Sequence, residues 1–376
     1  MRLMIFCNGP HCYGAEKVEL TLMKGLINAG HEVLCVASLW NDGVFPQMLD
    51  AYHIPYVQLP FIKLGKRLSY IGSMIRQLLR WPEAWLRTRW LLRNFRPDMI
   101  VMVQEDTAFL VRGLLRGQQC VYHVHGIEAL DTLLRQFRRW FTDGVIRRYV
   151  AVSRFVGDKL SENGAPVDKI KVIYNGLELA GSPSARGEGI QLARVRIGIV
   201  GQVGAWKGHL DFVEALGLLA KKGLPFEGHI FGEGSSEFKA DLRRKIGTLG
   251  LEGRITWHGY ERDTEAIFQS LDLITAPSIA EDPAPLVACE AGLRGLPAVV
   301  TRRGGLPEIV EDGVTGFVVE AQRPDQLADR LERLITDPGL RRTMGGKARE
   351  RIAERFSQER MVTEFEALCR ELASHA

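Results

Sequence analysis

The chain has 376 residues, 46 % of them hydrophobic and 25 % charged, a nearly ordinary globular composition at a length that predicts two domains. The formal net charge of +4 is unevenly distributed, because residues 1–180 hold 23 Lys and Arg against 16 Asp and Glu, while the remainder holds 26 against 29. The excess of basic residues in the first half indicates that this half binds an anionic partner.

Three classes of protein are excluded by the same inspection. No stretch approaches ~18 consecutive apolar residues, so no segment predicts a bilayer-spanning helix. The apolar run ahead of Asn8 is too short for the core of a signal peptide. Six scattered cysteines without a CxxC motif exclude a disulfide framework and indicate reduced thiols in a cytosolic protein.

The first half predicts a parallel α/β sheet. A strand at Leu3–Phe6 leads through a loop into a helix from about Ala15, which Gly30 ends, and a second strand follows at Val33–Leu39. This βαβ order requires a parallel sheet, because the helix carries the chain back over it. Further strands are expected at Met99–Val103, Cys120–Val124, Tyr149–Val152 and Lys171–Ile173.

A basic segment lies between these strands, from Phe61 to Pro97. It interleaves nine Lys and Arg and one acid with Trp81, Trp85 and Trp90, which is the composition of a helix lying in a membrane interface. A second such patch is expected at Arg135, Phe137, Arg138, Arg139, Trp140, Arg147 and Arg148. A solvated basic face and a single-stranded nucleic-acid surface are the alternatives, and a membrane surface ranks first.

A boundary is predicted at residues 179–191 (LAGSPSARGEGIQ), which are small, polar and rich in Gly and Pro. A second α/β series then follows, with a helix at His209–Lys222 ended by Gly223, and the tail from Ser357 to Leu372 is an amphipathic helix. The expected domains are 1–180, 192–356 and a terminal helix at 357–376. Strands are expected at Val195–Val200, Glu227–Phe231, Ile255–Trp257, Leu271–Ala276, Ala298–Thr301 and Gly316–Val319.

Three loops of the second half follow predicted strands, where doubly wound sheets bind ligands. The first is Gly201–Gly208, whose glycines let backbone N–H groups approach a phosphate and whose Lys207 adds a cation. The second, Glu281–Pro285, leads into an apolar helix holding Glu290, a carboxylate that needs sugar hydroxyl groups or a nearby arginine such as Arg294 or Arg302 as partner. The third has Gly304-Gly305. The first and third loops could each alone be only a turn.

Together these loops carry a resemblance to the family 4 retaining glycosyltransferases, which have the GT-B fold. The family's carboxylate, seven residues, then Glu, is matched by Asp282 and Glu290, and its Lys-Gly turn by Lys207-Gly208. The similarity covers nearly the whole chain. Further matches are Pro277-Ser278, Gly304–Val310, Gly313–Phe317, Phe231–Gly234, His258–Tyr260, Gly14-Ala15-Glu16, Val152-Ser153 and Asn175-Gly176.

The resemblance implies an α/β fold of two facing Rossmann-like parallel-sheet domains, with the C-terminal helix crossing back to the first. It implies transfer of a hexose-type sugar from a UDP- or GDP-sugar to a lipid-linked glycan or a lipopolysaccharide or exopolysaccharide precursor. The protein would be cytoplasmic and peripheral on the inner face of the cell membrane. No nucleic-acid partner and no cofactor are expected. No metal is expected either, since the sequence has no Asp-x-Asp motif and no His/Asp cluster with ligand spacing.

The resemblance also assigns roles. His125, Asp282, Lys207 and Glu290 form the expected catalytic group: His125 faces the donor sugar, Lys207 binds the diphosphate, and Glu290 holds the ribose. His123 is expected to be a core or strand-edge histidine instead. The donor-binding set is Gly14, Gln202, Gly204, Lys207, Glu281, Asp282, Pro283, Ala284, Pro285, Leu286, Val287 and Glu290.

Two departures from the family pattern bear on these roles. Gln202 stands where the family usually has Arg, so phosphate binding depends on Lys207, on backbone N–H groups and on Arg302 or Arg303. Glu281 competes with Asp282 as the first carboxylate, and the seven-residue spacing favours Asp282. The other functions considered are a sugar-nucleotide epimerase, a glycan phosphorylase, a non-catalytic sugar-nucleotide-binding or scaffold protein, and a dinucleotide dehydrogenase.

Overall fold

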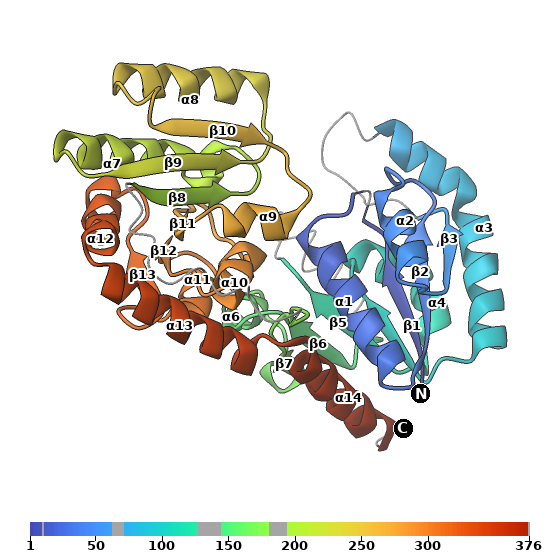
Figure 1. The fold of residues 1–376 in the computed structure, drawn as a ribbon. Helices are drawn as coiled ribbons and strands as arrows, with labels where there is room; N and C mark the ends of the chain where they lie inside the picture. The colour runs from blue at the N-terminus through green and yellow to red at the C-terminus, as the bar shows by residue number, and fades with distance from the viewer. Residues whose placement is uncertain (10, 62–70, 127–143, 180–193, 375–376) are drawn as a thin grey trace. The chain divides into compact units, whose positions relative to one another are not determined.

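The computed structural model describes residues 1–9, 11–61, 71–126, 144–179 and 194–374, and the chain divides into two compact units (Figure 1). Unit 1 consists of Met1–Glu178 together with Gln358–Ala376, and unit 2 consists of Leu179–Ser357. Each unit is built on one parallel sheet, which is the predicted Rossmann-like α/β class. Residues 62–70 of the first basic segment, 135–140 of the second basic patch and 180–191 of the predicted linker lie outside the described residues.

Unit 1 has a seven-stranded sheet in the order β3-β2-β1-β4-β5-β6-β7. From β1 the chain builds outward to β3, then returns to β4 on the other side of β1, so the strand order reverses between β1 and β4. Loops at such a reversal leave room for a ligand at the carboxyl ends of the strands. The strands are β1 (Arg2–Cys7), β2 (Glu32–Ser38), β3 (Tyr56–Leu59), β4 (Met99–Met102), β5 (Cys120–Val124), β6 (Arg148–Ala151) and β7 (Ile170–Val172).

The helices of unit 1 include the predicted first helix and the returning tail. The Glu16 carboxylate accepts a hydrogen bond from the Tyr13 N–H at 3.1 Å at the start of α1, and Gly30 takes the left-handed conformation just beyond its end. α14 packs against α1 with its apolar stripe buried, as predicted. The helices are α1 (Gly14–Asn28), α2 (Val44–Ala51), α3 (Ile71–Phe95), α4 (Glu105–Leu115), α6 (Arg154–Glu162), the 3₁₀ turn η2 (Val167–Lys169) and α14 (Gln358–Ser374).

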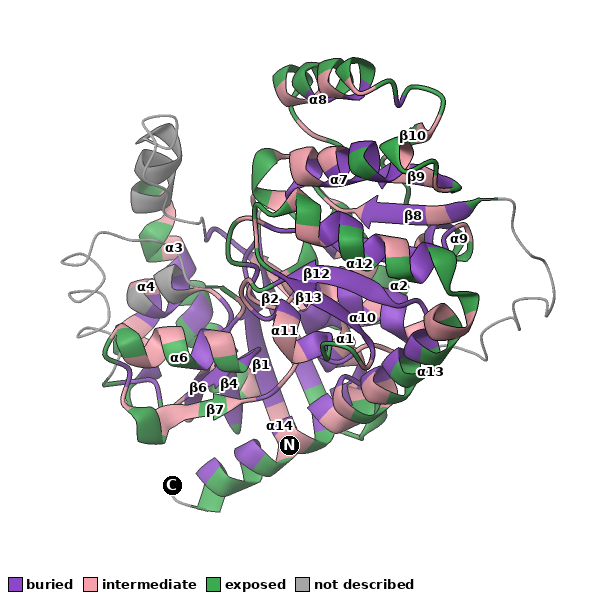
Figure 2. Cartoon of the chain, turned by 90° about the vertical axis from the view of Figure 1, so that its left-hand side faces the viewer, coloured by how far each residue is buried: buried purple, intermediate pink, exposed green. Residues whose placement is uncertain are grey.

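Unit 2 has a six-stranded sheet in the order β10-β9-β8-β11-β12-β13. Its strand order reverses between β8 and β11, and most of β8 is buried (Figure 2). The strands are β8 (Val195–Val200), β9 (Phe226–Phe231), β10 (Ile255–Gly259), β11 (Leu273–Ala276), β12 (Ala298–Thr301) and β13 (Gly316–Val319).

The helices of unit 2 cover a core centred on buried aromatic and branched side chains, among them Phe212, Phe226 and Leu331. α7 packs against α12, and α10 packs against α13. No helix in the described part of the chain is both long and apolar enough to cross a membrane. The helices are η3 (Ala205–Lys207), α7 (His209–Lys221), α8 (Ser236–Thr248), α9 (Thr264–Gln269), α10 (Leu286–Leu293), α11 (Leu306–Ile309), α12 (Pro324–Thr336) and α13 (Pro338–Arg355).

Candidate active site

Three loops of unit 2 follow β8, β11 and β12, and backbone hydrogen bonds join them into one group. The carbonyl oxygen of Trp206, after β8, accepts hydrogen bonds from the N–H groups of Ile279 at 2.8 Å and Ala280 at 3.2 Å, after β11. The carbonyl oxygen of Asp282 in turn accepts from the N–H of Gly305, after β12, at 2.8 Å. The sheet therefore brings the three predicted loops to one place, at its strand-order reversal.

Lys207 and Asp282 face each other across this group. The Lys207 ammonium donates to the Asp282 carboxylate, and the two side chains are only 18 % and 11 % exposed. The same ammonium lies 4.4 Å from the centre of the Trp206 ring. Two residues predicted to act on a donor, 75 positions apart in the chain, are thus in direct contact and mostly shielded from water.

Two glycines allow this close approach. Gly208 has φ of 75° and Gly304 has φ of 54°, both in the left-handed region that favours glycine. A Cβ on Gly208 would overlap the carbonyl oxygen of Pro277, and one on Gly304 would overlap the backbone of Asp282. Side chains at these positions would push the loops apart.

The two candidate first carboxylates have different partners. Asp282 is buried and contacts Lys207 in the loop after β8. Glu281 is exposed, accepts from the N–H of Gly304, and lies 3.5 Å from Nη1 of Arg303 in the loop after β12. Asp282 therefore contacts the predicted diphosphate-binding lysine, whereas Glu281 contacts the loop after β12.

The loop after β11 leads directly into α10, as predicted. Pro285 is buried at the start of the helix, whose first turn holds Leu286 and Val287, both half-buried. Glu290 follows Leu286 by four residues, so both lie on one helix face. Pro283 and Ala284 are half-buried on the approach to the helix.

The two arginines proposed as partners of Glu290 each donate to a different carboxylate. Arg294 donates to the backbone carbonyl of Glu290 at 2.9 Å and to the carboxylate of Glu265 at 2.8 Å. Arg302 donates to the carboxylate of Glu320 at 3.0 Å. The Glu290 side chain itself is half-buried.

His209, which directly follows the loop after β8, is a relevant residue that the sequence analysis did not single out. Gln202 is exposed, while the carbonyl of Gly204 lies 3.2 Å from Nδ1 of His209, the first residue of α7. Burial lowers the pKa of His209 to about 4, so its ring is neutral at pH 7. The position of this histidine, directly after the Lys-Gly turn, was the sequence signal from which its contact with the loop could have been predicted.

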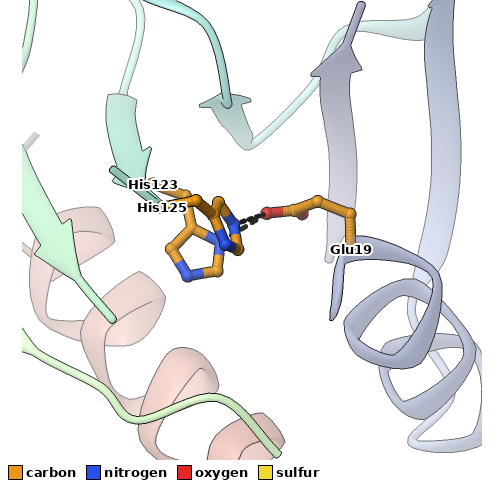
Figure 3. A group of neighbouring side chains, drawn as sticks. All are labelled: Glu19, His123 and His125. Carbon is orange, nitrogen blue, oxygen red and sulfur yellow. Dashed lines mark hydrogen bonds and ion pairs between the residues drawn. The ribbon is translucent and has the colours of Figure 1, made fainter. Parts of the chain in front are cut away.

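In unit 1, His125 lies just beyond β5 and is held by a residue of α1 (Figure 3). Its Nε2 lies 2.8 Å from Oε1 of Glu19, which is fully buried, while the His125 side chain is 11 % exposed. The buried His123 lies in the same group, with Nδ1 2.6 Å from the same oxygen. Gly14, the other predicted residue of this unit, is the first residue of α1.

This cluster corrects one expectation. The sequence predicts no cluster with metal-ligand spacing, but donor atoms of Glu19, His123 and His125 lie within 4.8 Å of one another. Two histidines and a carboxylate are a known zinc set, in which neighbouring ligand atoms lie about 3.3 Å apart. Here both nitrogens lie closer to the carboxylate, at hydrogen-bonding distances of 2.6 and 2.8 Å. Nε2 of His125 makes a hydrogen bond to Oε1 of Glu19, whereas neither ring nitrogen of His123 nor Oε2 of Glu19 has a hydrogen-bond partner among the described residues.

The cluster was missed because Glu19 lies 106 positions before His125. One signal was available: Glu19 shares a helical stripe with the buried Met23 and Leu26, at spacings of four and seven residues. A carboxylate on such a stripe requires a buried partner.

Comparison with known proteins matches both units. A family profile described as "Glycosyltransferase Family 4" matches residues 13–180, and one described as "Glycosyl transferases group 1" matches residues 185–351. The D-inositol 3-phosphate glycosyltransferase of Paenarthrobacter aurescens is 32 % identical over 58 % of this chain and 55 % of its own length. The chain thus spans about half of that relative.

Two further comparisons extend the match. A putative colanic acid biosynthesis glycosyltransferase, WcaL of Salmonella typhimurium, is 28 % identical over 70 % of this chain and 64 % of its own length. The crystal structure of Anabaena HepE in complex with UDP-glucose has a TM-score of 0.79 at 21 % identity, covering 99 % of this chain and all of that one. At this identity the structural match concerns the fold alone.

Proposed function

The chain belongs to the family 4 glycosyltransferases with the GT-B fold, and on that premise we propose that it transfers a hexose-type sugar from a UDP- or GDP-sugar to an acceptor hydroxyl group. The observation that carries the proposal is the contact of Lys207 with Asp282 at the strand-order reversal of unit 2. A largely shielded lysine beside glycine-rich loops is suited to a diphosphate.

We assign Lys207 to the leaving group. Negative charge builds on the nucleotide diphosphate as the sugar–phosphate bond breaks, and a nearby ammonium stabilises that charge. A bound diphosphate would become a second anionic partner of Lys207 beside Asp282. Asp282 could then accept hydrogen bonds from hydroxyl groups of the donor sugar.

The start of α10 adds to this charge stabilisation. The first N–H groups of a helix have no partners within the helix, and its dipole favours negative charge there. Leu286 and Val287 supply these N–H groups after Pro285. Glu290, one turn further on, is placed to accept hydrogen bonds from the ribose hydroxyl groups. The proposed leaving-group stabilisation is thus electrostatic and metal-independent, and the proposed outcome is retention at the anomeric carbon.

We further propose that the acceptor is a lipid-linked glycan or a lipopolysaccharide or exopolysaccharide precursor at the inner face of the membrane. Helix α3 supports this: Leu86 and Trp90 are 59 % and 64 % exposed, beside the exposed arginines 87, 89 and 93. The name of the relative WcaL, which refers to colanic acid biosynthesis, is consistent with such an acceptor.

A donor screen tests the proposal. The purified chain is incubated with UDP-, GDP-, ADP- and CMP-sugars, and slow release of the nucleotide is measured. One donor should be preferred, and Lys207→Ala should lower its turnover by about 100-fold, the effect of removing one preorganised charge donor. The matched control is Lys222→Ala, since Lys222 is an exposed lysine of the same unit that pairs with Glu332 at 2.5 Å. Release that is equal in Lys207→Ala and wild type would overturn the assignment.

A further inference from the structure

We propose that Glu19 is a positioning residue that fixes His125 as the tautomer protonated on Nε2, so that Nδ1 accepts a hydrogen bond from a sugar hydroxyl group. The inference rests on the proposed function and on the role that the family resemblance gives His125, beside the donor sugar. It adds a residue outside the family motifs and a direction for the hydrogen bond that His125 makes.

The first step is geometric. An ionised carboxylate only accepts hydrogen bonds, so the nitrogen of His125 that lies 2.8 Å from Oε1 of Glu19 must carry a proton. That nitrogen is Nε2. A neutral imidazole has a single N–H, so Nδ1 then holds a lone pair and can only accept.

The second step concerns the charge on Glu19. Burial alone would raise its pKa, but the nearby His123 and His125 together outweigh burial and hold the pKa at about 2. Glu19 is therefore ionised throughout the neutral range. The thiols of Cys7 on β1 and Cys35 on β2 also lie close enough to interact electrostatically with Glu19.

The neighbouring thiols do not change the protonation states of Glu19 and His125 near neutral pH. Burial, reinforced by the charge of Glu19, raises the pKa of both Cys7 and Cys35, so both thiols stay protonated. Burial and the neighbouring His123 lower the pKa of His125, although Glu19 opposes them. His125 is accordingly neutral at pH 7, as the single tautomer requires.

The third step is rigidity. The ring of His123 lies 4.4 Å from that of His125 and 5.9 Å from that of Phe365 on α14, measured between centroids. Phe365 is itself fully buried. Glu19 and the two rings therefore form a packed group that restrains His125.

The chemical consequence is selectivity for a hydroxyl group. A phosphate oxygen needs a hydrogen-bond donor, which Nδ1 in this tautomer cannot supply, whereas a sugar hydroxyl group can donate to it. His125 is thus suited to orienting a sugar and unsuited to neutralising the diphosphate.

The test is the ¹⁵N NMR spectrum of the full chain labelled at histidine nitrogens, at pH 7. The His125 signals are identified by their loss in His125→Gln. We expect an unprotonated Nδ1 and a protonated Nε2 in the wild type. In Glu19→Gln this single tautomer should be lost, because the glutamine amide can also donate to Nε2.

A matched control is Glu366→Gln, because Glu366 holds His31 in the same way, with Oε1 2.7 Å from Nε2, elsewhere in unit 1. It should alter only the His31 signals. Turnover of the preferred nucleotide sugar should fall by about 10- to 100-fold in Glu19→Gln and stay unchanged in Glu366→Gln.

Three outcomes would overturn the inference: a protonated Nδ1 on wild-type His125, an unchanged tautomer in a folded Glu19→Gln, or a stoichiometric metal ion bound to these residues by elemental analysis. The wild-type spectrum shows which nitrogen of His125 is protonated, so it tests the inference even if Glu19→Gln does not fold. A wild type that turns over no nucleotide sugar refutes the proposed function, while the spectrum still reports the tautomer.

Discussion

At the scale of single residues, the candidate donor site depends on glycines, which have no side chain, as well as on charged residues. Gly208 separates Lys207 from α7 and lies against the backbone of Pro277. Its left-handed conformation turns the chain so that Lys207 reaches Asp282. A larger residue would meet the rigid backbone of the neighbouring loop rather than a flexible side chain.

This arrangement predicts that Gly208→Ala is more harmful than a comparable change at the far end of the same helix. Gly223 follows α7 with φ of 71° and has open space around a built Cβ, so Gly223→Ala should cost only the conformational penalty of about 1–2 kcal/mol. Gly208→Ala adds a backbone overlap and should lower the free energy of unfolding further, measured by urea denaturation. It should also weaken donor turnover, which Gly223→Ala should not. Equal effects of the two changes would contradict the role given to Gly208.

The residues on loops with motifs could be predicted from the sequence, whereas Glu19 could not. Lys207, Asp282 and Glu290 stand in short patterns whose spacing is readable. Glu19 stands in no pattern and meets His125 only through the packing of α1 beside β5. Contacts of this kind depend on the sheet order, which a single sequence leaves open.

At the scale of elements, α3 has two contrasting sides. Ala84, Thr88 and Leu91 recur at spacings of four and three residues and are buried, which is the stripe that packs inward. Leu86 and Trp90 share the exposed side with arginines. Exposed tryptophan beside arginine is typical of a helix that lies in a membrane interface.

The exposed side of α3 predicts binding to anionic membranes. Co-sedimentation with vesicles of phosphatidylglycerol and phosphatidylcholine should bind the wild type, and binding should weaken as salt rises. Replacing both Leu86 and Trp90 by Ala should reduce the bound fraction several-fold. Val167→Ala is the control, because Val167 is 71 % exposed on η2 in the same unit. A double variant that sediments like the wild type would contradict this interface.

Most elements of the sheets could be located from the sequence, because buried parallel strands are continuous apolar runs. The bounds of β5, β8, β12 and β13 agree with those predicted. Two neighbours, α2 and β3, were not predicted. α2 has only eight residues and contains a proline, and β3 is a four-residue edge strand that is mostly half-buried. Neither leaves a clear periodic signal.

At the scale of the whole molecule, each unit has its own sheet and its own reversal of strand order. The charge asymmetry follows the same division: the excess basic residues lie in the half that forms most of unit 1, which includes α3. Unit 2 carries the grouped loops after β8, β11 and β12. We therefore assign nucleotide binding to unit 2 and binding to an anionic membrane surface to unit 1.

The most direct test of this assignment is hydrogen–deuterium exchange of the full chain with and without UDP and GDP. We expect the nucleotide that binds to slow exchange in 201–208, 277–287 and 302–306 and to leave exchange in α3 unchanged. A nucleotide that binds by calorimetry yet leaves exchange in these three loops unchanged would show that they do not form the donor site.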